Sequence, residues 1–347
     1  MSFEEVKSGS NHESSRCKLA LLLTAALLVP FCFTWIQHDL LSHLRETIGQ
    51  DLRQPPCSLN GELVGGSCVC DKPWTGPDCS SLSFQPVTFP QGYGMSPNVT
   101  SWGGNAIFDD SMYHIFVSVM TNGCPLQKWT TNSRIEHGIA SQITGPYEFK
   151  DVAVNTWSHN AAPVVLKDGT FAIFHIGYGD GPPDGGDDCA RMHHAGTVMQ
   201  RPSAKATAGS TIHVSKSLHG PWTALHPNKL IGCDNPAPWV HMSNGTIYIV
   251  CRGGSFFGSF LRADNITGPW TLVSQIRMSA QNGPVGTYED PFLYSDQRGL
   301  WHLLYHVYIT TENPPHGHEC VNSTVSAHAY SLDGFHWFVS PHQPYTT

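Results

Sequence analysis

Acidic residues stand side by side at the start of strand-like segments in this 347-residue chain. Glu289 and Asp290 come directly before Pro291 and an aromatic run, and Asp234 precedes a similar run. Neighbouring carboxyl groups can perform general acid/base chemistry, because one can hold a proton while another is ionised. Crowding would raise the pKa of Glu289, which makes it the candidate general acid, with Asp290 as base or orienting group. Asp234 supplies a third carboxylate, although all three residue types also suit turns.

The sequence contains few motifs that indicate other kinds of functional site. The chain contains neither a G-x-S-x-G nucleophile motif nor a Gly-rich phosphate loop. Its formal charge of −8 gives no basic face for nucleic acid. The histidines at 193–194 and 316–318 match no zinc-site spacing, so no metal site is predicted. The acidic loop 179–189 could hold Ca²⁺ through oxygen ligands, but it lacks EF-hand spacing, and a solvated loop is the alternative.

The composition indicates an all-β protein. Charged residues make up only 13% of the chain, which contains 33 glycines and 25 prolines. Four segments read as an apolar strand, a polar turn and an aromatic strand, and a Gly-containing turn with an aromatic follows each. The hairpins are 105–120, 163–178, 238–254 and 291–308, and the second elements are 141–149, 217–225, 264–273 and 331–339. Four-strand units returning about every fifty to seventy residues predict β-propeller blades, with a β-sandwich as the alternative.

A propeller would bring the starts of these units together at one end of a central channel. Those starts are Trp102-Gly103-Gly104, His159-Asn160, Asp234-Asn235 and Glu289-Asp290. Because the first strand of each blade lies along the channel, we expect residues that are distant in sequence to converge there.

The hairpins, the GPY/GPW elements and especially Tyr288-Glu289-Asp290-Pro291-Phe292 resemble the five-bladed β-propeller glycosidases over about 95–345. This is the arabinanase, xylosidase and arabinofuranosidase group (glycoside hydrolase family 43) with its invertase-like relatives. The resemblance implies a propeller domain over 82–347 that binds a carbohydrate substrate and hydrolyses it with carboxylates, without a cofactor. It further implies that sugar hydroxyls are bound by His159, Asn160, Asn235 and His306, and that Trp102 or Trp239 stacks on a sugar ring. A core histidine and two strand-end asparagines are the alternative interpretation of His159, Asn160 and Asn235.

The sequence departs from this family in two ways. Trp102-Gly103-Gly104 stands where the resembled enzymes usually place an aspartate, and the next blade carries Asn160. Only four complete blades can be counted, so the sequence predicts a five-bladed type that is either truncated to about four complete blades or closes imperfectly. These departures leave a non-catalytic, lectin-like propeller as the alternative to a hydrolase. A Golgi glycosyltransferase ranks third, because it would need an alternating βαβ core.

The N-terminal region predicts a type II membrane protein. A polar cytosolic tail (1–18) precedes the uncharged apolar run 19–36, with Arg16 and Lys18 on its N-terminal side. A cleaved signal peptide is the rival interpretation. A stem (37–54) follows, and the glycosylation sequons Asn98, Asn244, Asn265 and Asn322 all lie beyond the span. These features predict a Golgi or cell-surface location with a luminal or extracellular ectodomain.

Residues 55–80 contain four closely spaced cysteines, Cys57, Cys68, Cys70 and Cys79, and resemble the C-terminal half of an EGF-like module. This resemblance implies the pairs Cys57–Cys68 and Cys70–Cys79, and a zinc site is the competing interpretation. The other five cysteines beyond the apolar run are Cys124, Cys189, Cys233, Cys251 and Cys320, whose pairing the sequence does not determine. Nothing in the sequence indicates the oligomeric state.

Overall fold

The computed structural model describes residues 54–86, 92–94, 96, 98–189, 209–226, 231–252, 257–278, 286–309 and 324–345. The predicted tail, apolar span and stem lie outside these residues, apart from Gln54, and so do Asn322 and Cys320. No helix among the described residues is long and apolar enough to cross a membrane. The membrane anchor and the cellular location therefore stay predictions.

The larger part of the described chain forms four antiparallel sheets, each built from four consecutive strands. The first sheet contains β5 (Ser101–Asp109), β6 (Met112–Met120), β7 (Ser133–Ala140) and β8 (Glu148–Val154), and the second β9 (His159–Val165), β10 (Phe171–Ile176), β11 (Ser210–Ser215) and β12 (Thr223–Ala224). The third contains β13 (Asp234–Val240), β14 (Ile247–Arg252), β15 (Phe257–Ala263) and β16 (Thr271–Arg277), and the fourth β17 (Gly286–Ser295), β18 (Trp301–Ile309), β19 (Thr324–Ser331) and β20 (Trp337–Val339). Between β6 and β7 lie η2 (Leu126–Lys128) and α2 (Trp129–Asn132).

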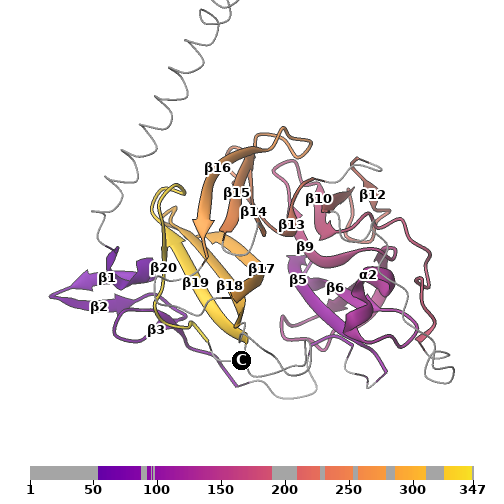
Figure 1. The fold of residues 1–347 in the computed structure, drawn as a ribbon, viewed down its shortest axis with the longest axis horizontal. Helices are drawn as coiled ribbons and strands as arrows, with labels where there is room; N and C mark the ends of the chain where they lie inside the picture. Colours follow the sequence, from indigo (N-terminus) through magenta and orange to yellow (C-terminus); the bar gives the residue numbers. More distant parts are fainter. Residues whose placement is uncertain are drawn as a thin grey trace, which may run out of the picture. The chain divides into compact units, whose positions relative to one another are not determined.

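The four sheets are the blades of a β-propeller. The first strands of successive sheets contact one another, β5 with β9, β9 with β13 and β13 with β17, and these strands lie together at the centre of the view in Figure 1. The prediction of an all-β propeller with about four complete blades is confirmed, the sandwich alternative is wrong, and the assignment to the five-bladed type stays a prediction. Neither a fifth four-stranded sheet nor the alternating βαβ core of a glycosyltransferase occurs within the described ranges.

The recurring Gly-aromatic element joins the second, third and fourth blades each to the blade before it. In three blades a tryptophan at the start of the fourth strand packs edge-on against a buried phenylalanine of the preceding sheet. The three pairs are Trp222 with Phe116 (5.3 Å between ring centroids, 81°), Trp270 with Phe174 (6.3 Å, 80°) and Trp337 with Phe260 (5.5 Å, 81°). Edge-to-face contacts are favourable because the positive ring edge meets the negative ring face. The sequence repeat is therefore a repeat of interblade contacts.

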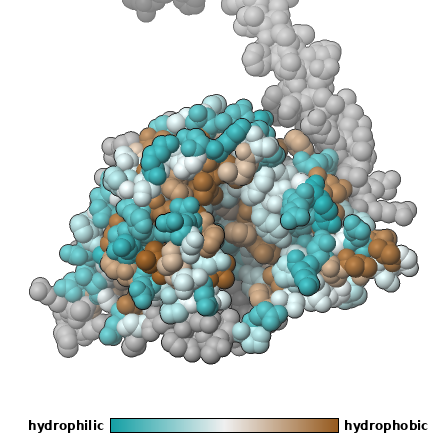
Figure 2. Space-filling view, turned by 180° about the vertical axis from the view of Figure 1, so that it is seen from behind, coloured by the Kyte–Doolittle hydropathy of each residue, from teal (hydrophilic) through white to brown (hydrophobic). Residues whose placement is uncertain are grey.

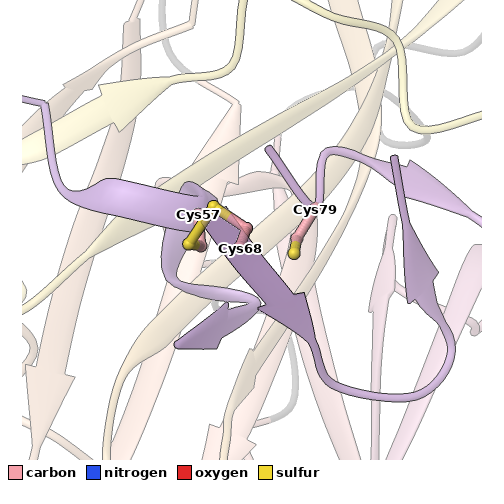
Figure 3. A group of neighbouring side chains, drawn as sticks. All are labelled: Cys57, Cys68 and Cys79. Atoms are coloured by element: carbon pink, nitrogen blue, oxygen red, sulfur yellow. A yellow bond between two sulfur atoms is a disulfide. The ribbon is translucent and has the colours of Figure 1, made fainter. Parts of the chain in front are cut away.

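The N-terminal module is small and held by disulfides. It contains η1 (Pro56–Leu59), β1 (Gly61–Val64), β2 (Ser67–Cys70), β3 (Trp74–Thr75) and β4 (Ser81–Leu82). Disulfides join Cys57 to Cys68 and Cys70 to Cys79, the pairs that the EGF resemblance implies. Figure 3 shows the Cys57–Cys68 bond, with Cys79 beside it. Because all four sulfurs are in disulfides, the zinc interpretation of these cysteines is wrong.

The module packs on the fourth blade. Trp74 is buried and its ring lies 4.8 Å from that of His328 on β19. From the β17–β18 turn, the Arg298 guanidinium donates a hydrogen bond to the Leu59 carbonyl (2.6 Å) and pairs with Asp71 (2.8 Å). One arginine thus connects the module to a blade, while apolar contacts through Trp74 supply the buried area.

Replacing Arg298 with alanine is expected to loosen the module without unfolding the propeller. Partly exposed ion pairs contribute about 0–1 kcal/mol, so the free energy of unfolding should change little. Protease cleavage within 55–81 should nevertheless become faster. Arg262→Ala, which removes an exposed arginine paired with Asp264 in the third blade (2.6 Å), is the matched control. Equal cleavage rates in the two variants would contradict the role of Arg298.

The remaining disulfides and the acidic loop lie in the blades. Cys124 pairs with Cys189 and Cys233 with Cys251. In the loop 179–189, which could have held Ca²⁺, the Asp187 carboxylate lies 2.9 Å from the Lys128 amine, and both side chains are buried. A buried lysine already neutralises this carboxylate, which argues against a cation there. The predicted glycosylation residues Asn98, Asn244 and Asn265 are exposed, and their glycosylation stays a prediction.

Candidate active site at the blade starts

Each inner strand has a left-handed residue near its start. The φ angles are +53° at Gly103, +53° at Asn160, +47° at Asn235 and +49° at Asp290. The pairing with the neighbouring strand shifts at each of these positions, so all four are β-bulges. Glycine, asparagine and aspartate tolerate this conformation best, which gives a backbone reason for the residue types at the blade starts. Bulges also redirect side chains, and here the side chains of Trp102, Asn160, Asn235 and Asp290 meet one another.

The bulges gather side chains from all four blades. The Asn160 amide donates hydrogen bonds to the Asn235 side-chain oxygen and, at 2.5 Å, to Asp290 Oδ1. The Trp102 side chain also hydrogen-bonds the Asp290 carboxylate. A Cβ at Gly103 would lie 2.8 Å from Asn160 Oδ1, so the first blade can approach this closely only with glycine there. We call these residues the blade-start cluster, together with four neighbours described next: Asp234, Arg252, Glu289 and His306.

Arg252 connects the remaining two carboxylates. It lies on β14 opposite Asp234, and its Nε donates to Asp234 Oδ2 at 2.8 Å. Its Nη1 donates to Glu289 Oε1 on the neighbouring blade. Burial lowers the pKa of the guanidinium, but the charges of Asp234 and Glu289 outweigh that effect, and the pKa of Arg252 is raised. Arg252 therefore stays charged and holds the two carboxylates side by side.

Asp290 has a different electrostatic environment. Burial raises the pKa of its carboxyl group, and the charge of Glu289 raises it further. His306, whose Nδ1 lies 3.7 Å from Asp290 Oδ2, and the hydrogen bonds from Asn160 and Trp102 act in the opposite direction. The net pKa is above the ordinary value of an aspartate. The side chain is still 25% exposed, so a ligand or water could reach it.

Seven of the predicted site residues lie in this cluster: Trp102, Asn160, Asp234, Asn235, Glu289, Asp290 and His306. Arg252 was missed, because an arginine at the end of a second strand has no distinguishing sequence pattern. Tyr345 was also missed. Burial and the nearby charge of Asp290 raise the pKa of its hydroxyl. Its position two residues before the end of the chain gave no sign of a role.

His159 does not join the cluster. Its side chain is buried, its Nδ1 lies 2.8 Å from Ser133 Oγ, and its ring stacks on Trp129 with centroids 5.0 Å apart. Burial lowers the pKa of His159 to about 3, so it stays neutral at physiological pH. Successive residues of a strand point to opposite faces, which directs His159 into the blade interior while Asn160 meets the cluster.

Trp239 does not join the cluster either. It lies toward the other end of β13, where its ring packs edge-on against Trp301 with centroids 4.9 Å apart. There it lines a cavity of about 550 Å³ together with His241, Ser295 and Asp296. The face of the molecule turned away from Figure 1 is hollowed near its middle and carries both hydrophobic and hydrophilic residues (Figure 2). Trp239 thus belongs to the contact between the third and fourth blades.

The blade-start cluster contains one set of metal-type ligands. Donor atoms of Glu289, Asp290 and His306 lie within 4.8 Å of one another. Arg252 already donates to Glu289, and its positive charge would repel a metal ion bound at the same oxygen. The arrangement therefore suits proton transfer and polar binding better than metal coordination.

Gly103→Ala is expected to disturb this cluster. A left-handed alanine is strained, and its Cβ would also collide with the Asn160 amide that holds Asp290. We expect a loss of about 1–3 kcal/mol in the free energy of unfolding. Gly299→Ala is the matched control, since Gly299 also has a positive φ of +82° but no atom within 4 Å of an added Cβ. If urea denaturation gives equal losses for both variants, the close approach at Gly103 contributes nothing.

Comparison with known proteins gives one family match and several structural similarities. Residues 54–81 match the teneurin-like EGF domain family. No curated protein sequence matches the chain significantly. An endo-arabinase from Bacteroides thetaiotaomicron is 14% identical, with a TM-score of 0.44, over 70% of this chain and 80% of that one.

Two further solved structures are similar to the same extent. A thermostable family-43 glycoside hydrolase is 12% identical, with a TM-score of 0.47, over 76% of this chain and 77% of that one. An exo-β-1,3-galactanase from Phanerochaete chrysosporium, solved with galactose, is 13% identical with a TM-score of 0.46 over 70% of this chain, which spans 49% of the galactanase. At these identities and TM-scores we base no functional conclusion on the similarities. The family match concerns the N-terminal module alone, which is similar to teneurin-like EGF domains.

Proposed function

We propose that this protein is a glycan-processing glycoside hydrolase of the secretory pathway that acts at the blade-start cluster. The observation that carries the proposal is that three neighbouring carboxyl groups have different electrostatic environments. Arg252 pairs with Asp234 and Glu289, whereas Asp290 has a raised pKa. Glycoside hydrolysis needs both a protonated carboxylic acid and an ionised carboxylate beside the scissile bond.

The environments suggest a role for each group. Asp290 would donate a proton to the leaving oxygen, because its raised pKa favours the protonated form. Glu289, held by Arg252, would act as the ionised carboxylate that activates water or stabilises positive charge on the sugar. This assignment exchanges the roles expected from the sequence, where Glu289 was the candidate acid. Asn160 and Asn235 would orient Asp290 and present polar groups to sugar hydroxyls.

The secretory setting has separate support. Four disulfides join described cysteines, and disulfides persist in oxidising compartments. Three sequon asparagines are exposed, as glycosylation requires. The apolar run 19–36 would supply the membrane anchor and the positive residues before it the type II orientation.

One observation favours a second function, a non-catalytic glycan-binding propeller. Arg252 occupies an oxygen of both Asp234 and Glu289, and such pairing also suits a rigid polar binding surface. The two functions are separated by assaying the purified full-length protein on a panel of 4-nitrophenyl glycosides and oligosaccharides, and by measuring its binding to a glycan array. Hydrolysis above the background of a variant that carries both Asp290→Asn and Glu289→Gln supports the hydrolase. Glycan binding without hydrolysis supports the binding protein, and the absence of both results contradicts both functions.

A further inference from the structure

Buried histidine pairs recur on neighbouring strands of three blades. In each pair a ring nitrogen on the second strand of a blade faces a ring nitrogen on the third strand. The pairs are His114–His137 (2.9 Å), His175–His213 (2.8 Å) and His302–His328 (3.1 Å). All six side chains are buried. Because a neutral imidazole carries one N–H, each pair has two protons for its hydrogen bonds.

Two of the pairs need only those two protons. His175 Nδ1 donates to the Ile176 carbonyl at 3.0 Å, so its Nε2 accepts from His213. In the fourth blade His302 Nε2 interacts with Asp296, at 3.8 Å, and the second proton lies between His302 and His328. In both pairs two neutral rings supply the protons for these contacts, and the buried His328 Nδ1 is left without a hydrogen-bond partner.

The first-blade pair is one proton short. His114 hydrogen-bonds the Asp109 carbonyl, and its Nδ1 faces His137 Nε2. His137 Nδ1 in turn lies 3.2 Å from the Asp151 carboxylate. Both ends of this chain are oxygen acceptors, so three contacts share two N–H groups. When His114 donates to the carbonyl and His137 Nε2 donates to His114, a lone pair on His137 Nδ1 faces the Asp151 carboxylate.

In that tautomer a cation can lie between the His137 lone pair and the Asp151 carboxylate. An extra proton would join only His137 and Asp151, whereas the geometry brings a third donor, His219, to the same carboxylate. A metal cation fits instead, since a neutral imidazole nitrogen and a carboxylate oxygen are both metal ligands. The N–H of a ligating histidine usually donates to a second partner, and here His137 Nε2 would donate to His114.

A third ligand comes from the second blade. His219, in the loop between β11 and β12, places its Nδ1 3.8 Å from the same Asp151 oxygen. Donor atoms of His137, Asp151 and His219 all lie within 4.8 Å of one another. Tetrahedral zinc with ligand bonds of about 2.0–2.1 Å separates its ligands by about 3.3 Å, close to the 3.2 Å and 3.8 Å found here. His219 is 51% exposed, which leaves a path for the ion from solvent.

We propose that His137 Nδ1, Asp151 and His219 Nδ1 form a binding site for Zn²⁺ or a similar divalent transition metal, with water in the fourth position. The site lies away from the blade-start cluster and does not depend on the proposed hydrolase activity. Because Asp151 and His137 belong to the first blade and His219 to the second, the bound ion would link two blades. No sequence pattern indicates this site, because its three ligands come from separated segments of the chain.

The test measures metal binding by the full-length protein after treatment with EDTA. We expect the wild type to bind one equivalent of Zn²⁺, and Co²⁺ to give the visible absorption of a tetrahedral nitrogen and oxygen site. His219→Ala removes one of three protein ligands, so it should weaken this binding by at least about tenfold and remove the Co²⁺ spectrum. Zn²⁺ should raise the unfolding temperature of the wild type, but not that of this variant.

Two further variants keep the test decisive. His336→Ala removes an exposed histidine whose Nδ1 also pairs with an aspartate, Asp333, at 2.7 Å, but without a third ligand. It should bind Zn²⁺ and Co²⁺ as the wild type does. Asp151→Asn should weaken binding as His219→Ala does. If the wild type binds no Zn²⁺ at micromolar concentrations, or if His219→Ala and Asp151→Asn bind it as tightly as His336→Ala, the site does not exist.

Discussion

Replacing Asp290 with asparagine is expected to lower the rate of glycoside hydrolysis by about 10²–10⁴-fold, the usual contribution of a general acid. The amide keeps an oxygen that can accept the Asn160 hydrogen bond, and asparagine tolerates the left-handed backbone as well as aspartate does. The fold should therefore survive while the transferable proton is lost. The measurement is kcat/KM on the best substrate from the glycoside panel, for wild type and variant.

The pH profile tests the same assignment. Because Asp290 must be protonated to act, activity should fall as pH rises through its pKa, which lies above the ordinary value for an aspartate. The free energy of unfolding should also fall as pH rises. A carboxyl group with a raised folded-state pKa contributes stability below its unfolded pKa, and this is lost as pH rises through the folded pKa. Asp290→Asn should remove both dependences.

Asp264→Asn is the control for this prediction. Asp264 is a largely exposed aspartate of the third blade that pairs with Arg262. It should leave kcat/KM unchanged. If Asp290→Asn retains activity within a few-fold of the wild type while Glu289→Gln abolishes it, the proton donor is Glu289, as the sequence alone suggested.

The largest effect on stability is expected for Phe260→Ala. Phe260 is 1% exposed and lies between the third and fourth blades. Its ring centroid is 5.1 Å from Trp301, 5.4 Å from Tyr248 and 5.5 Å from Trp337. Truncation removes these contacts and leaves a cavity that rigid aromatic neighbours cannot fill, so we expect a loss of about 3–5 kcal/mol in the free energy of unfolding.

Phe335→Ala provides the comparison for this measurement. Phe335 lies in the turn before β20 with 59% of its surface exposed, so its truncation should cost less than about 0.5 kcal/mol. Urea denaturation of both variants gives the difference. If Phe260→Ala cost no more than Phe335→Ala, aromatic packing between these blades would not stabilise the propeller.

Much of the architecture could be predicted from local patterns. The hairpins are visible because alternating apolar residues and turn residues act within about ten positions of one another. The repeated Gly-aromatic elements mark the interblade contacts, because the aromatic residue of the element packs against the preceding blade each time. The residue types at the blade starts follow from a backbone conformation that glycine, asparagine and aspartate adopt easily. Because a propeller brings the starts of its blades together, the sequence then predicted that Asp234, Glu289 and Asp290 would lie close to one another.

The tertiary structure alone decided which partners these residues have. Arg252 joins Asp234 to Glu289 and thereby leaves Asp290 as the group with the raised pKa. His159 points into a blade, although its neighbour Asn160 reaches the cluster. The contact of His219 with Asp151 joins residues 68 positions apart through a loop of another sheet. The periodicity of the sequence specifies a strand and its two faces. The tertiary structure determines which distant side chain contacts each face. The pKa of a site residue depends on that contact.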